Sequence, residues 1–328
     1  MQAPLAHLVL PQWQAAAYAS PRNRSALPGT FHRLDAIILD PYVQVPRVFN
    51  RIAVLHQYLL PKQFITVLAG KFASARAGRL TTWVIRCFVR HYGVNMQEAV
   101  EPDINRYATF NEFFTRPLRP EARPQTPCDY LCPIDGAVSQ FGSIEDGRIF
   151  QAKGHDYSAL ELLGGDAKLA AQFEHGSFAT LYLSPKDYHR VHMPCDGRLQ
   201  RMIYVPGALF SVNPTTARGV PRLFARNERV ICEFASEQGV FVVVLVGATI
   251  VGSMQTVWHG VVNPPRTGKI REWRYEGGIL LRKGEEMGRF LLGSTVVVLF
   301  PKDTLRFNPE WSPTRLVCMG EMMATNAA

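Results

Sequence analysis

A Gly293-Ser294-Thr295 step separates two apolar runs in this 328-residue chain, and no other stretch constrains its fold and chemistry as strongly. Residues 296–300 are mostly β-branched or aromatic, so they predict a buried strand. Gly293 has no side chain, which leaves its carbonyl open to close approach, and Ser294 places a hydroxyl beside that carbonyl. Once a base removes the hydroxyl proton, the oxygen can attack the carbonyl and convert an amide into an ester. A turn or bulge that enters a strand has the same sequence, so the rest of the chain must decide.

The composition predicts a globular protein with an anionic partner. Hydrophobic residues make up 47% of the chain and charged residues 19%, which is typical of a packed core rather than of disorder. The net charge of +9 favours nucleic acid or an anionic membrane surface as the partner. The six cysteines form no Cys-x-x-Cys pair and are expected to be reduced thiols in a cytosolic setting. No apolar run reaches the roughly 18 to 20 residues of a membrane span.

Residues 51–95 favour the membrane surface over nucleic acid. They contain no Asp or Glu and seven basic residues: Arg51, Lys62, Lys71, Arg76, Arg79, Arg86 and Arg90. Apolar residues follow the spacing of one helix face at Leu80, Trp83, Val84, Cys87 and Phe88. Pro61 is suited to open a preceding helix that carries Phe64, Ile65, Leu68 and Phe72. An apolar face with aromatic residues and a basic polar face are typical of a helix in a membrane interface. An amphipathic helix that packs on its own domain is the alternative, and no nucleic-acid-binding motif is present.

We expect three regions along the chain. Residues 1–50 are rich in Ala and Pro and form a leader that is either disordered or docked on the body. Residues 51–115 are expected to form a helical, membrane-associating region. Residues 116–328 are expected to form a β-rich catalytic domain, because short apolar runs alternate there with Gly, Pro and Asp-Gly turns. A helix is expected at residues 158–174, and the chain after residue 301 is expected to be irregular. The predicted fold class is α+β, with N-terminal amphipathic helices before a mainly antiparallel β domain.

Three side chains supply the groups of a nucleophilic triad. Asp135 lies at an Asp-Gly turn, His192 lies three residues after a second histidine, His189, and Ser294 follows Gly293. An Asp, a His and a Ser recur as a triad on unrelated folds in different chain orders. Ser294 is not part of a Gly-x-Ser-x-Gly elbow, which argues against an α/β-hydrolase. The two histidines lack the spacing and the companion ligands of a zinc site, so no metal is expected.

Several longer motifs occur in a fixed order and give the chain a resemblance to a known family. They lie at residues 110–120, 135–136, 151–155, 187–194, 204–207, 224–230, 247–252 and 292–295. In these motifs, over residues 55–305, the chain resembles the bacterial phosphatidylserine decarboxylase proenzymes, which are pyruvoyl-dependent. Leu292-Gly293-Ser294-Thr295 is similar to the processing signature of the family. Residues 1–50 and the stretch after residue 301 follow no pattern of the family.

The resemblance implies that the chain cleaves itself between Gly293 and Ser294. His192, oriented by Asp135, would act as the base on Ser294, and attack on the Gly293 carbonyl would form an ester. β-Elimination would then cut the chain, and loss of ammonia would leave a pyruvoyl group as a covalent cofactor. The products would be a β chain, residues 1–293, and a short α chain that begins at residue 294. Cleavage within one chain or between two is left open, as is the oligomeric state, a homodimer included.

The resemblance also implies the reaction of the mature enzyme. The pyruvoyl carbonyl would form a Schiff base with phosphatidylserine and accept the electrons left by CO2, so that phosphatidylethanolamine is released. His189 would contact the substrate carboxylate or deliver a proton, with a structural role in its loop as the alternative. The implied partners are the lipid substrate and an anionic membrane surface, without nucleic acid. The implied location is the cytoplasmic side of the cell membrane, with peripheral attachment.

Other classes of protein remain open from the sequence. A serine hydrolase would use Asp135, His192 and Ser294 on an external substrate. A membrane-bound, β-rich binding module would need none of these residues for chemistry. A soluble pyruvoyl decarboxylase that acts on a small amine is a further variant.

Overall fold

The computed structural model describes residues 57–58, 60–152, 154–250, 253–263, 266–293 and 295–327. These residues all belong to one unit, Gln44–Ala328. The predicted leader at residues 1–50 and the predicted nucleophile Ser294 lie outside the described residues. Both chain neighbours of Ser294 are described, so the approach to it can be followed from either side.

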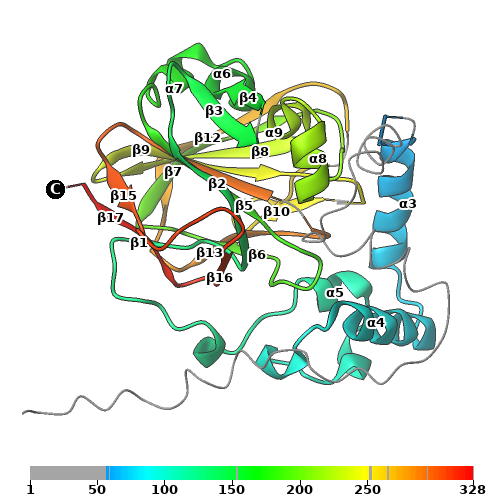
Figure 1. The fold of residues 1–328 in the computed structure, drawn as a ribbon. Helices are drawn as coiled ribbons and strands as arrows, with labels where there is room; N and C mark the ends of the chain where they lie inside the picture. Colours follow the sequence, from blue (N-terminus) through cyan, green and yellow to red (C-terminus); the bar gives the residue numbers. More distant parts are fainter. Residues whose placement is uncertain are drawn as a thin grey trace, which may run out of the picture. The chain divides into compact units, whose positions relative to one another are not determined.

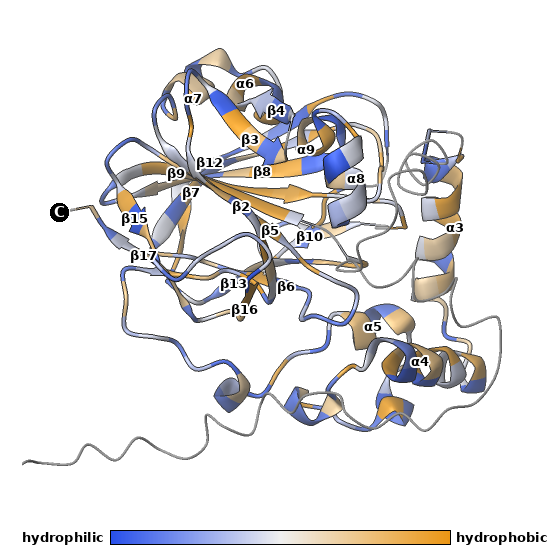
Figure 2. Ribbon diagram, in the orientation of Figure 1, coloured by the Kyte–Doolittle hydropathy of each residue, from blue (hydrophilic) through white to orange (hydrophobic). Residues whose placement is uncertain are grey.

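An eight-stranded sheet forms the centre of the fold, in the strand order β12-β7-β8-β9-β14-β5-β2-β16 (Figure 1). In this order the strands are Arg271–Leu281, Gly197–Val205, Arg229–Ser236, Gly239–Val246, Thr295–Phe300, Ser177–Tyr182, Gly136–Ser143 and Leu316–Val317. Every neighbouring pair is antiparallel. Hydrophobic residues are concentrated on the central strands (Figure 2). The prediction of an α+β fold with mainly antiparallel strands is therefore confirmed.

The predicted buried strand at residues 296–300 is β14, and it begins one residue earlier, at Thr295. It lies between β9 and β5, with Val297 opposite Val244 on the β9 side. All six of its residues are buried. At its end Phe300 stacks on Phe241, with ring centroids 5.7 Å apart. Full burial of one Val, Leu or Phe side chain stabilises a fold by about 1.5–3 kcal/mol. Since every residue of β14 is buried, this strand is central to the core.

A second, four-stranded sheet precedes β14 in the chain and has the order β11-β10-β13-β6. Its strands are Gly260–Val261, Met254–Thr256, Glu286–Phe290 and Arg190–His192. β13 ends at Phe290 and β14 begins at Thr295, so the chain passes from one sheet to the other at the predicted cleavage site.

The chain after residue 301 is more regular than predicted. β1 (Tyr130–Leu131), β17 (Met322–Asn326) and β15 (Leu305–Phe307) form a three-stranded sheet in that order. Met323 and Ala324 of the middle strand are fully buried. The sequence prediction missed this sheet because β17 is short and one of its partners lies near residue 130, far away in the chain.

The helix predicted at residues 158–174 is two short helices, α6 (Ala159–Leu162) and α7 (Ala167–Ala171). Gly164 and Gly165 lie between them with φ of 74° and 88°, a left-handed conformation that ends a helix. The same part of the structure contains a hairpin and two more helices: β3 (Arg148–Ala152), β4 (His155–Ser158), α8 (Pro214–Gly219) and α9 (Leu223–Arg226).

Two helices occur where the sequence predicts them, α3 (Lys62–Ser74) and α4 (Arg79–Tyr92). α4 packs on α5 (Phe110–Phe114), with the Phe88 ring 5.2 Å from that of Phe110 (Figure 1). Single-turn helices follow at Met96–Glu98, Ile104–Arg106 and Pro120–Ala122. No described helix is long and apolar enough to cross a membrane.

The predicted apolar face of α4 is divided between the inside and the outside. Val84 and Phe88 pack inward beside the buried Ile85, whereas Leu80 and Trp83 are exposed. The contact with α5 needs only one stripe of the helix, so the neighbouring stripe is left uncovered. Figure 2 shows hydrophobic and hydrophilic residues mixed around this helix.

Candidate active site

Gly293 lies in the segment that joins the two sheets. Leu291 N donates to Ser253 O at 3.0 Å as the chain leaves β13. On the far side, Thr295 is fully buried and pairs with both β5 and β9. The backbone is therefore fixed on both sides of the predicted cleavage point.

His189 lies just before β6 and presents one ring nitrogen to Gly293. The side chain is fully buried, its Nδ1 is 2.8 Å from Asp187 O, and its ring lies 4.0 Å from that of Phe114. Because a carbonyl can only accept, Nδ1 carries the proton and Nε2 carries a lone pair. Nε2 has no hydrogen-bond partner among the described residues, and it lies 3.3 Å from the position of a Cβ on Gly293. Burial lowers the pKa of His189 to about 3, so the ring is neutral at pH 7.

His192 ends β6, and both of its ring nitrogens are engaged. Nδ1 donates to Gly284 O at 2.9 Å, so Nε2 accepts a hydrogen bond from Tyr188 Oη at 3.1 Å. Burial lowers the pKa of His192, which favours the neutral ring. Gly284 and Tyr188 together fix the orientation of this imidazole.

Asp135 lies immediately before β2 and is buried. Arg123 Nε lies 2.9 Å from both carboxylate oxygens, and Met319 N donates to Oδ1 at 2.9 Å. The structure thus differs from the expectation that Asp135 orients His192, because the guanidinium can bind both oxygens of the carboxylate at once. Burial is the largest effect on the pKa of His192 and lowers it, whereas Asp135 raises this pKa only as the last and weakest of several smaller effects.

Two hollows adjoin the segment that contains Gly293. A cavity of about 210 Å³ reaches Gly293 itself. Its walls include the aromatic Phe88, Tyr92 and Phe114 and the polar Ser211, Asn213 and Thr249. A groove of about 540 Å³ runs between α3 and the residues before Gly293, and it includes Lys71, Leu291 and Leu292. Leu292 lines both spaces.

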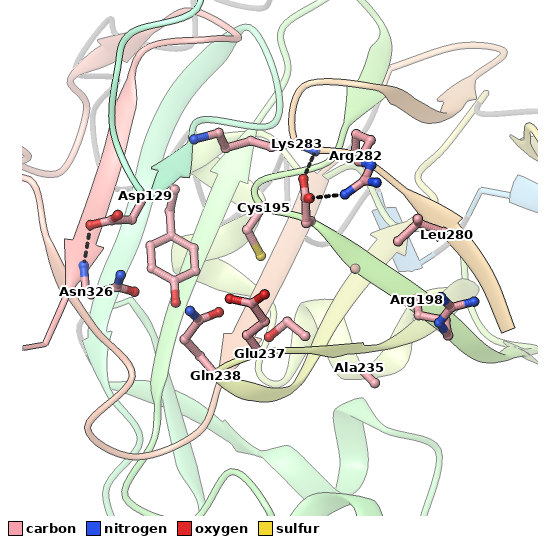
Figure 3. Close-up of a pocket in the computed structure, with 14 residues that line it drawn as sticks. Asp129, Cys195, Arg198, Ala235, Glu237, Gln238, Leu280, Arg282, Lys283 and Asn326 are labelled. Atoms are coloured by element: carbon pink, nitrogen blue, oxygen red, sulfur yellow. Dashed lines mark hydrogen bonds and ion pairs between the residues drawn. The ribbon is translucent and has the colours of Figure 1, made fainter.

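A third hollow, of about 530 Å³, contains none of the predicted site residues (Figure 3). Arg282 binds Asp196 at 2.8 Å, and Lys283 N donates to the same carboxylate. Asn326 N donates to Asp129, as the dashed lines in Figure 3 show. These charged groups hold one another in place, and the pocket is separate from Gly293.

Sequence reasoning missed several groups that hold the predicted residues. Tyr188 lies in the same short segment as His189 and His192, and this closeness in sequence is the one feature from which its role could have been predicted. Arg123 lies in a Pro-rich segment without periodicity, which gives no signal. The backbone groups of Gly284 and Met319 leave no mark in a sequence at all.

Gly136 follows Asp135 at a place without room for a side chain. A Cβ at this position would lie 2.1 Å from the carbonyl oxygen of Tyr182. We expect Gly136→Ala to lower the free energy of unfolding by about 1–3 kcal/mol, because β2 would have to shift away from β5. Gly142→Ala is the matched control on the same strand, with a φ of 151° against 158° and no described atom within 4 Å. Urea unfolding of the two variants in a Ser294→Ala background measures the difference, and an equal loss for both would contradict the steric argument.

Known proteins similar to this chain show both its class of enzyme and its family. The family model "Phosphatidylserine decarboxylase" matches residues 110–325, and the model "PSD" matches residues 52–93. A phosphatidylserine decarboxylase proenzyme of Dechloromonas aromatica is 72% identical over 279 residues, which is 85% of this chain and 99% of the relative. Proenzymes of the same name from Herminiimonas arsenicoxydans and an Azoarcus species are each 68% identical, over 85% and 84% of this chain and 95% and 96% of the relatives.

These matches define a decarboxylase, which is an enzyme of the carboxy-lyase class. The chain belongs to the phosphatidylserine decarboxylase family. The matches include β13 and β14 and both histidines of the site, since the first family model extends from residue 110 to residue 325.

Proposed function

We propose that this enzyme decarboxylates phosphatidylserine to phosphatidylethanolamine with a pyruvoyl group made from Ser294 by cleavage after Gly293. The observation that carries the proposal is the Nε2 lone pair of buried His189, which faces Gly293 at the crossing between the sheets. A pyruvoyl group supplies a carbonyl that accepts the electrons left by the departing carboxylate. The names of the relatives support the same substrate, and the serine hydrolase alternative is not favoured.

His192 is the proposed base for chain cleavage, with Asp135 as its charge partner. Its neutral ring is the form that can accept the Ser294 proton. Tyr188 Oη now donates to Nε2 of this ring, so that hydrogen bond must be released before the proton is taken. Asp135 then favours the charged ring that results, because opposite charges lower its energy.

His189 is the proposed group for the reaction of the mature enzyme. Its tautomer is fixed by Asp187 O, so Nε2 can accept a proton but does not carry one. This tautomer does not suit the expected delivery of a proton by His189; Nε2 is instead placed to accept a hydrogen bond from the amine of the substrate and so to orient it. The Phe114 ring lies against the imidazole and helps to keep water away from it.

The two hollows beside Gly293 suit the two parts of a phospholipid. The smaller cavity combines aromatic and polar walls, and we assign it to the head group. The larger groove between α3 and Leu291 has the apolar Val67 and Leu292 in its walls and two cations, Lys71 and Arg266. We assign this groove to the part of the lipid that leads to the membrane.

The two chains produced by cleavage are expected to remain together. The small chain would contain β14, which is paired along its length with β5 on one side and β9 on the other. It would also contain β17, the middle strand of the three-stranded sheet. Both interfaces consist of sheet hydrogen bonds and buried apolar side chains, so a cut beside Thr295 removes neither.

Intact mass measurement of the purified enzyme tests the proposal. The expected result is two chains, the smaller beginning at residue 294 with a blocked N-terminus. Treatment with borohydride in the presence of phosphatidylserine should add the lipid amine irreversibly to the small chain and abolish activity. A fully active enzyme that consists of one uncut chain would overturn the proposal.

The outward faces of α3 and α4 support peripheral attachment to the cytoplasmic side of an anionic membrane. Phe64, Leu68 and Phe72 repeat every four residues on α3 and are all at least half exposed, while Thr66 and Ala73 on the opposite side are buried. On α4 the exposed Trp83 lies beside a stripe of exposed arginines, namely Arg79, Arg86 and Arg90. Each basic residue near an anionic leaflet contributes about 1 kcal/mol to binding.

We expect the double variant Leu68→Ser and Phe72→Ser to weaken binding to phosphatidylglycerol-containing vesicles by roughly tenfold or more, because two apolar side chains no longer enter the interface. Vesicle sedimentation measures the change. The matched control is the double variant Phe150→Ser and Leu316→Ser, which removes two exposed apolar side chains from the β domain. Equal weakening by both double variants would show that α3 is not the attachment site.

A further inference from the structure

The carboxylate of Asp135 is held by groups that cleavage would place on different chains. Arg123 belongs to the large chain and binds both carboxylate oxygens through Nε. Met319 belongs to the small chain and donates its backbone N–H to Oδ1. The two donors approach from segments almost 200 residues apart in sequence, so the position of Asp135 depends on both.

Arg123 is itself fixed on its other side. Its Nη2 lies 2.9 Å from Glu98, and its Nη1 donates to Ala122 O at 2.6 Å. The Arg123 side chain is only 14% exposed and that of Asp135 only 7%, so solvent screens this ion pair little. Removal of the guanidinium would leave a buried carboxylate with the N–H of Met319 as its one remaining donor among the described residues.

The segment around Met319 is locked against the part of the chain that carries Arg123 and Asp135. Gly320 N donates to Cys132 O at 3.1 Å, and Thr126 N donates to Gly320 O at 2.8 Å. Gly320 has a φ of 89°, and a Cβ there would lie 2.8 Å from Pro124 O, so the close approach requires glycine. This packing holds the Met319 N–H at the carboxylate.

We propose that Arg123 and the backbone N–H of Met319 are the positioning groups that hold Asp135 for chain cleavage. The C-terminal segment, which becomes part of the small chain, thereby helps to complete the site that releases it. This inference rests on the proposed role of Asp135 in cleavage. Among the described residues, neither group has a hydrogen bond to Gly293 or His192, so both act through Asp135.

The test follows cleavage of the full-length chain on gels after a pulse of cell-free translation. Asp135→Asn is expected to block cleavage, and Arg123→Gln to slow it roughly 100-fold, as expected when a catalytic group is misplaced by about 1 Å. Arg123→Lys should restore part of the rate, because it returns the charge and one donor. Arg201→Gln is the matched control and should cleave normally, since Arg201 is 13% exposed and binds Asp166 and Glu233 away from the site.

A second pair of variants tests the backbone donor. Met319→Pro removes the N–H and should be cut far more slowly than Met319→Leu, which changes the same side chain but keeps the N–H. If Arg123→Gln fails to fold, the Arg123→Lys and Met319 variants still decide the matter. Wild-type rates for Arg123→Gln and Met319→Pro, with Asp135→Asn blocked, would overturn this inference and leave the proposed function intact. Normal cleavage of Asp135→Asn would instead overturn the proposed role of Asp135.

Discussion

Ser294→Ala is expected to yield a single chain of full length with no measurable decarboxylase activity. Alanine has no hydroxyl to attack the Gly293 carbonyl, so the backbone is not cut and no pyruvoyl group forms. Loss of a group on which a whole reaction sequence depends lowers activity by roughly 10⁴-fold or more. Intact mass and release of labelled CO2 from phosphatidylserine measure the two effects on the same sample.

Two further variants show whether the loss comes from the chemistry of residue 294. Ser294→Cys retains a nucleophile and should be cut slowly, which alanine cannot reproduce. Ser236→Ala is the control: it removes a serine hydroxyl that binds Gly239 O in a distant turn, and it should be cut and active like the wild type. An uncut Ser294→Ala chain with full activity would contradict the proposed cofactor.

The elements that could be predicted from the sequence are those with local signals. The run at residues 296–300 predicts β14 because β-branched residues favour strands, and the structure places it at the centre of the large sheet. α3 and α4 follow from their apolar period. His189 and His192 are found together because they share one short segment.

The features that could not be predicted depend on contacts between distant parts of the chain. The sequence does not show which stripe of α4 will meet α5, so Leu80 and Trp83 could not be placed outside and Ile85 inside. Asp135 could be identified from its turn, but its partner Arg123 approaches along an extended segment without periodicity. Neither can a sequence show that a backbone group such as Met319 N will reach a carboxylate.

His192→Ala and His189→Ala are expected to stop the two proposed reactions separately. Without the His192 imidazole, no base takes the Ser294 proton, so the chain should remain uncut and inactive. Without the His189 imidazole, the chain should still be cut, but turnover of phosphatidylserine should fall by roughly 10²-fold, as expected when a substrate is misplaced by about 1 Å. Gels measure the cut, and CO2 release from the purified, cut protein measures the turnover.

His259→Ala is the control for this pair, since it removes an exposed imidazole from the turn after β10 and should change neither reaction.

Because burial holds the pKa of His189 near 3, protonation of its ring should not limit turnover between pH 5 and pH 8. An imidazole with an ordinary pKa of about 6.5 would instead cause a loss of activity below pH 6.5. The opposite result, in which His189→Ala blocks the cut and His192→Ala permits it, would contradict the assignment. His189 would then be the base for chain cleavage, in keeping with the position of its Nε2 beside Gly293.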